Sequence, residues 1–133
     1  MDKIFEDISA SERKTIIDRI LNEIKGRMME EIVLLETSIA KKDKKILKLQ
    51  FSVGEFDMVV VDTKNITCEI YEIKHSSEII KEQQRHLLDE KKCRETEFRY
   101  GKITDKYVIY RGEDKTLENG IKYINVENYL VKL

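Results

Sequence analysis

Residues 54–74 read GEFDMVVVDTKNITCEIYEIK, and this stretch decides the fold. Two runs rich in valine and isoleucine flank a polar centre at residues 63–65, a pattern typical of a β-hairpin. Asp57 lies in the first run, and Glu72 and Lys74 end the second. Residues two apart on a strand share a face, so we expect Glu72 and Lys74 to point the same way, beside Asp57 of the neighbouring strand. The hairpin therefore predicts a compact site for a hard cation and a water.

Length and composition predict one globular domain over residues 1–133, with residues 1–8 as a flexible lead-in. The chain is 41% hydrophobic and 38% charged. Its net charge of −1 gives no overall positive field that would attract nucleic acid. No apolar run is long enough for a membrane span, and the N-terminus has no signal-peptide pattern. Cys68 and Cys93 lack C-x-x-C spacing, so we interpret them as reduced thiols of a cytoplasmic protein.

The N-terminal third predicts one long amphipathic helix. Ser9 and Glu12 form a capping box, and the helix extends from about residue 10 to residue 40 or breaks near Gly26. We expect its apolar stripe to face the core, with Glu30 to one side of the stripe. The stripe recurs at intervals of three and four and consists of Ile16, Ile17, Ile20, Leu21, Ile24, Met28, Ile32, Leu35 and Ile39.

The rest of the chain predicts an α/β fold with a central mixed sheet of about five strands flanked by helices. The hairpin is antiparallel, and a crossover helix after it makes the next strand parallel. Asn125 is expected to cap the last helix. The expected strands are residues 46–51, 56–61, 66–73, 106–111 and 121–124, and the expected helices are residues 76–91 and 126–130.

The ordered motifs resemble the PD-(D/E)xK nuclease superfamily. Asp57, fourteen further residues and then Glu72-Ile73-Lys74 match its D-x(n)-E-x-K pattern, and residues 26–30, GRMME, match a helical G-x-x-x-E. More narrowly, these segments and the tail resemble the nuclease-like C-terminal domain of certain prokaryotic AAA+-type ATPases. No G-x-x-x-x-G-K-[ST] motif occurs, so the resemblance implies that this chain corresponds to such a domain, with ATP binding in an attached ATPase.

The resemblance implies a restriction-endonuclease-like fold and a magnesium or manganese site. Asp57, Glu72 and the backbone carbonyl of Ile73 would bind the metal, and Glu30 would reach it from the helix. Lys74 would orient or activate the attacking water.

The resemblance also implies DNA as the substrate and phosphodiester hydrolysis as the reaction. Gln83 on the helix after the motif is a further expected catalytic residue. Lys81, Arg85 and Arg99 are expected to contact the nucleic-acid backbone.

Three alternatives remain open from the sequence. The acids and Lys74 could form an ordinary salt bridge on the surface of the hairpin. The domain could retain every site residue and still be a catalytically inactive module that binds DNA or a protein partner and regulates an attached ATPase. It could also serve as an oligomerisation or docking domain.

Overall fold

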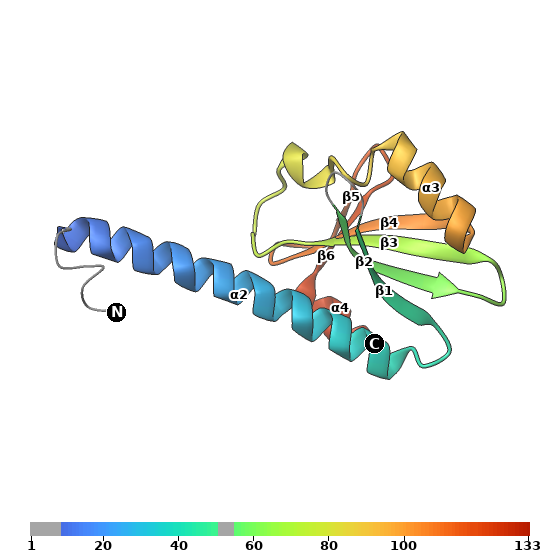
Figure 1. Cartoon of the computed structure of the whole chain (residues 1–133), viewed down its shortest axis with the longest axis horizontal. Helices are drawn as coiled ribbons and strands as arrows, with labels where there is room; N and C mark the ends of the chain where they lie inside the picture. Colours follow the sequence, from blue (N-terminus) through green and yellow to red (C-terminus); the bar gives the residue numbers. More distant parts are fainter. Residues whose placement is uncertain (1–8, 51–54) are drawn as a thin grey trace.

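A computed structural model describes residues 9–50 and 55–133, and it contains one mixed sheet of six strands in the order β1-β2-β3-β4-β6-β5. Helices α2 and α4 cover one face of the sheet, and α3 covers the other (Figure 1). The elements are α2 (Ala10–Ala40), β1 (Lys45–Gln50), β2 (Glu55–Asp62), β3 (Thr67–Ile73), a 3₁₀ turn (Lys81–Gln84), α3 (Glu90–Tyr100), β4 (Lys102–Tyr110), β5 (Lys115–Thr116), β6 (Lys122–Asn125) and α4 (Val126–Lys132).

The predicted α/β class is confirmed, with six strands in place of about five. The two-residue strand β5 was missed because it has no apolar pattern. β1, β2 and β3 pair antiparallel, whereas β4 pairs parallel with both β3 and β6, as the crossover predicted. The expected lead-in, Phe51 and Gly54 lie outside the described residues. No helix of the described ranges combines the length and apolar composition that a membrane crossing needs.

Alternation along the strands divides the core into two layers. Val59 of β2 and Ile70 of β3 point toward α3, and Val60 and Tyr71 point toward α2 and α4. All four side chains are at most 3% exposed, so both faces of the central strands are covered. This explains the uninterrupted apolar run of β2, which is typical of strands buried on both sides.

The long helix α2 is continuous through Gly26, and Ser9 caps it by accepting a hydrogen bond from the Glu12 amide at 3.2 Å. The prediction that its apolar stripe enters the core is wrong. Val33, 0% exposed, packs against the sheet, and Thr37, also 0% exposed, contacts Tyr129 of α4. The stripe residues Ile16, Ile17, Ile20, Leu21, Ile24, Met28, Ile32, Leu35 and Ile39 are all 40–59% exposed.

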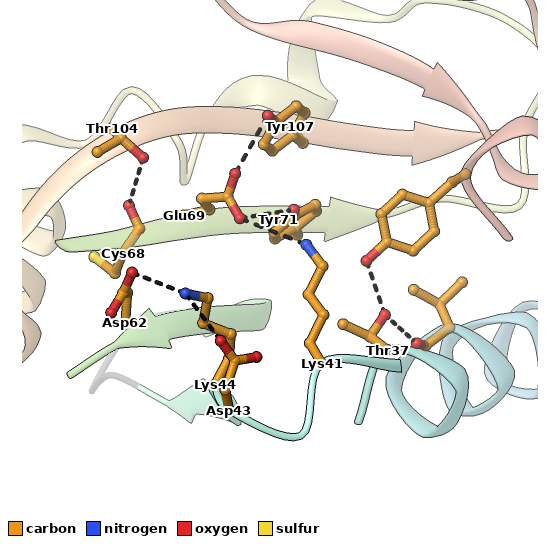
Figure 2. A network of polar contacts seen from close by, with 12 residues as sticks. Thr37, Lys41, Asp43, Lys44, Asp62, Cys68, Glu69, Tyr71, Thr104 and Tyr107 are labelled. Carbon is orange, nitrogen blue, oxygen red and sulfur yellow. Dashed lines mark hydrogen bonds and ion pairs between the residues drawn. The ribbon is translucent and has the colours of Figure 1, made fainter. Parts of the chain in front are cut away.

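Polar contacts attach the C-terminal end of α2 to the sheet (Figure 2). The Thr37 hydroxyl lies 2.8 Å from the Tyr129 hydroxyl of α4 and donates to the Val33 carbonyl at 2.6 Å. Just beyond the helix, the Lys41 ammonium lies 3.9 Å from the Glu69 carboxylate of β3. These contacts fix which side of the helix faces the sheet.

The predicted helix over residues 76–91 is wrong. The Ser76 hydroxyl accepts a hydrogen bond from the Glu78 amide, which favours a turn, and only the 3₁₀ turn Lys81–Gln84 follows. Helix α3 begins later, where the Asp89 carboxylate accepts from the Lys92 amide at 3.1 Å. The buried residues of α3 are Lys92, Cys93 and Thr96, so this helix carries no apolar periodicity that the sequence could reveal.

Two glycines should respond oppositely to replacement by alanine. A Cβ at Gly26 would lie 3.6 Å from the His75 Cβ, an ordinary contact, so Gly26→Ala should raise the free energy of unfolding by about 1 kcal/mol. Gly101 has φ +101°, and a Cβ there would lie 2.1 Å from the Ile66 carbonyl oxygen. Gly101→Ala should therefore lower the free energy of unfolding by about 2 kcal/mol or more. Urea titrations of both variants measure the two changes.

Candidate functional site

A β-bulge positions Asp57. β2 has one residue more than β1 at this point of the ladder, so Asp57 and Met58 together lie opposite Lys48. The regular pairing of β2 with β3 ends at Met58 and Tyr71, and the same register carried one residue further sets Asp57 opposite Glu72. Bulges bend a strand and re-aim side chains.

Asp57, Glu72 and Lys74 meet at the end of this hairpin. The Asp57 carboxylate accepts a hydrogen bond from the Ile73 amide at 2.8 Å. One Glu72 oxygen, Oε2, lies 3.6 Å from the Lys74 ammonium. Asp57 is 8% and Glu72 1% exposed, whereas the Lys74 side chain is 36% exposed. Glu72 and Lys74 are thus within ion-pair distance, as the salt-bridge alternative predicts, but the Glu72 carboxyl is buried and does not lie on the surface of the hairpin.

The other Glu72 oxygen is the unusual atom of the site. Oε1 is buried and has no hydrogen-bond partner among the described residues. Burial raises the pKa of Glu72 to about 9, the neighbouring Asp57 carboxyl contributes to the rise, and the Lys74 ammonium offsets part of it. Glu72 is therefore protonated at neutral pH unless a cation takes the place of the proton.

The chemistry of these groups fits a hard divalent cation. The N–H and C=O of one strand residue point to the same side, so the Ile73 carbonyl faces β2, as its amide does. Two carboxyl groups and a carbonyl are oxygen donors of the kind that Mg²⁺ takes, with waters completing its shell. Within residues 9–50 and 55–133 no three acidic, histidine or cysteine side chains gather around one point.

Glu30 is not brought to Asp57 and Glu72. Its carboxylate lies 2.8 Å from the Lys48 ammonium of β1. Helix α2 packs on the Ile73 side of the sheet, which is opposite to the side of Glu72 because neighbouring strand residues alternate. Glu30 therefore reaches the sheet from the other face.

Gln83 is held by its own loop. Its side-chain oxygen accepts from the Ile80 amide at 3.0 Å and from the Tyr123 hydroxyl at 2.9 Å, and its nitrogen donates to the Glu78 carbonyl. These bonds shape the 3₁₀ turn and connect it to β6. The oxygen and the nitrogen of the Gln83 side chain, which a catalytic role would use, are therefore already hydrogen-bonded within the protein.

The expected phosphate-contacting residues are spread over two ends of the molecule. Lys81 and Arg85 are exposed on the segment that follows the Glu72–Lys74 end of β3, and Arg85 pairs with Glu82 at 3.0 Å. Arg99 lies in the last turn of α3. The chain continues from there into β4, whose first residue, Lys102, pairs with Thr67 at the start of β3. Glu72 is five positions further along β3 than Thr67, a distance of about 16 Å.

His86 is a neighbour of the site that the motif does not mark. The Lys92 ammonium donates a hydrogen bond to its Nδ1, which requires a neutral ring with Nδ1 unprotonated. Burial lowers the pKa of His86, and the charges of Lys92, Arg85 and Lys74 lower it further. The charge of Asp57 acts in the opposite direction and raises the pKa of His86. In the sequence, His86 is marked as a candidate by its spacing, three residues after Gln83.

A second polar cluster lies on the opposite face of the sheet (Figure 2). The Glu69 carboxylate accepts from the hydroxyls of Tyr71 and Tyr107, both at 3.3 Å, and these two rings stack with their centroids 4.7 Å apart. The cluster borders a cavity of about 300 Å³. Glu69 was not predicted as a site residue, although an acid within a buried strand was a signal. Its partners indicate that it anchors Lys41 and α2.

Comparison of the chain with protein-family models, with curated proteins and with solved structures found no match. The functional proposal below therefore depends on the geometry of the site and on the motif resemblance.

The raised pKa of Glu72 predicts a specific pH dependence of stability. Between its ordinary value of 4.5 and about 9, the folded protein holds one proton more than the unfolded chain. The free energy of unfolding should therefore fall with rising pH in this window, by up to about 1.4 kcal/mol per unit. Glu72→Gln should remove this fall, because the amide stays neutral. Urea titrations of the wild type and of Glu72→Gln from pH 5 to pH 9 without metal measure the two pH dependences. If the free energy of unfolding changes with pH in the same way in both proteins, Glu72 is not the group with the raised pKa.

Proposed function

We propose that this domain binds Mg²⁺ or Mn²⁺ through Asp57 and Glu72 and hydrolyses phosphodiester bonds of DNA. The observation that carries the proposal is the buried Glu72 carboxyl, which faces Asp57, has one unpartnered oxygen and lies 3.6 Å from Lys74. A polar group buried without a partner is costly, and such groups concentrate at functional sites. The motif resemblance supports the restriction-endonuclease-like assignment of the fold, with its expected DNA substrate and attached ATPase.

The oxygen ligands and the lysine of the site would have different roles. Asp57, Glu72 and the Ile73 carbonyl would hold the cation, which would lower the pKa of a bound water and neutralise phosphate charge. Binding displaces the Glu72 proton, so affinity for the cation should increase with pH up to about 9. Lys74, the most exposed of the three side chains, would orient the water and stabilise charge on the phosphate.

The second candidate is a non-catalytic module of the same fold that binds DNA or a protein partner and regulates an attached ATPase. Two observations favour it. Glu30 is paired with Lys48 and Gln83 with its own loop, so two of the expected catalytic residues are engaged elsewhere. The two remaining acids are also buried, which restricts the approach of a phosphodiester.

A nuclease assay with Mg²⁺ or Mn²⁺ on single- and double-stranded DNA separates the two functions. The wild type should cleave, and Asp57→Asn and Lys74→Ala should each slow cleavage at least about 100-fold, because each removes a group that acts on the cation or the water. Lys91→Ala, which removes an exposed lysine of α3, is the matched control and should cleave like the wild type.

Thermal melts with and without Mn²⁺ test the cation site independently of cleavage. Mn²⁺ should raise the melting temperature of the wild type and of Lys74→Ala, and it should leave that of Asp57→Asn unchanged. Asp57→Asn should be at least as stable as the wild type without metal, because it removes one of two close acids. The non-catalytic module is favoured if the wild type cleaves neither single- nor double-stranded DNA and its melting temperature does not change with millimolar Mn²⁺.

A further inference from the structure

Helix α2 exposes an apolar face along most of its length. We call Ile17, Ile20, Ile24, Met28, Ile32 and Leu35 the outer stripe; each of these side chains is 44–59% exposed. From its first to its last residue the outer stripe is about 27 Å long. An apolar strip of this length with charged residues beside it marks an interaction surface.

The outer stripe faces away from the protein's own sheet. Residues two apart on a helix lie on nearly opposite sides. Leu35 is two positions from both Val33 and Thr37, which are 0% exposed against the sheet and α4. In the same way, Ile24 and Met28 are each two positions from Gly26, which lies beside His75. Its side chains are 44–59% exposed, and no element within residues 9–50 and 55–133 covers it.

The N-terminal half of α2 projects beyond the sheet, clear of the other elements (Figure 1). Most of the stability of a helix in a protein comes from packing of its apolar face. In this half Ile17, Ile20 and Ile24 are 44–48% exposed, so the described part of the chain leaves this face of the helix unpacked. A partner along the outer stripe would supply that packing.

The spacing of the outer stripe is palindromic. Ile17 and Leu35, Ile20 and Ile32, and Ile24 and Met28 are three pairs, each symmetric about Gly26. Two identical helices that run antiparallel with their centres aligned therefore place each residue of the outer stripe opposite another residue of the outer stripe. A self-complementary patch of this kind is what a two-fold interface requires.

The charges along α2 favour the same orientation. Residues 10–27 contain five basic and three acidic side chains, a net charge of +2, and residues 28–40 contain three acidic side chains and no basic one, a net charge of −3. Antiparallel pairing sets the positive half of one helix against the negative half of the other, whereas parallel pairing sets like halves together. Such charge patterns select partner and orientation.

We propose that a second copy of this chain docks on the outer stripe, forming a two-fold dimer in which the two α2 helices pack antiparallel. The free N-terminal half of each helix then covers the exposed stripe on the sheet-bound half of the other. The two sheets lie on the outer sides of the helix pair, at opposite ends. This proposal is independent of the metal site.

Light scattering after size exclusion tests the dimer. The wild-type chain should have twice its 15.8 kDa mass over a dilution series from millimolar to micromolar. Ile24→Glu with Met28→Glu should raise the dimer dissociation constant at least about 100-fold, because the carboxylates would be buried at the centre of the interface. Both residues are solvent-exposed in the single chain, so the sheet should keep its wild-type circular dichroism.

Phe98→Glu is the matched control. Phe98 is 93% exposed on α3, away from the outer stripe, and its replacement should leave the dimer intact. A wild type that is monomeric throughout, or a dimer that survives Ile24→Glu with Met28→Glu, overturns the proposal.

Cysteine cross-linking with a short bismaleimide tests the orientation. A mixture of Ile17→Cys and Leu35→Cys chains should cross-link, and neither variant should cross-link alone. The parent chain is the control, since its own thiols, Cys68 and Cys93, are buried. Cross-linking of Ile17→Cys with itself, or no cross-link in the mixture, overturns the antiparallel arrangement.

Discussion

The burial of the Glu72 carboxyl beside Asp57 is the constraint on which the rest of the site depends. The regular pairing of β2 with β3 ends just before this pair. Beyond it, the Asp57 carboxylate accepts the hydrogen bond of the Ile73 amide, in the place of a backbone carbonyl of β2. The bulge in β2 and the nearby Lys74 ammonium both accommodate the two acids. A close acid pair in a covered position costs stability, so a cation, a proton or both must balance it.

Much of the fold could be predicted, because the sheet depends on local patterns. Apolar β-branched runs marked the antiparallel strands, and the length of chain between β3 and β4 implied a parallel crossover. The position of the crossover helix could not be predicted. Ile79, Ile80, Leu87 and Leu88 suggested helical spacing before residue 91. None of these four residues is in an α-helix, and of the four only Leu87 is buried, whereas α3 buries Lys92, Cys93 and Thr96. Apolar periodicity is informative only where apolar side chains make the contact.

The candidate site was partly predictable for the same reason. Glu72 and Lys74 follow from the strand period of two, and Asp57 from hairpin register, so these three residues meet. The position of the Glu30 side chain relative to Asp57 and Glu72 depends on which side of α2 faces the sheet. The apolar stripe suggested the wrong side. Hydrophobic periodicity identifies a helix face that needs a partner, and it does not say whether that partner belongs to the same chain.

The order of the strands also bears on aggregation. An open sheet offers unpaired backbone groups at its two edges, here β1 and β5, and an exposed edge can recruit strands of other molecules. β1 carries the exposed lysines Lys45 and Lys48, and its pairing with β2 is interrupted by the bulge. β5 has only two residues, too few to serve as a template. Both edges are therefore poorly suited to edge-to-edge fibre growth, even though the strands between them are among the most apolar segments of the chain.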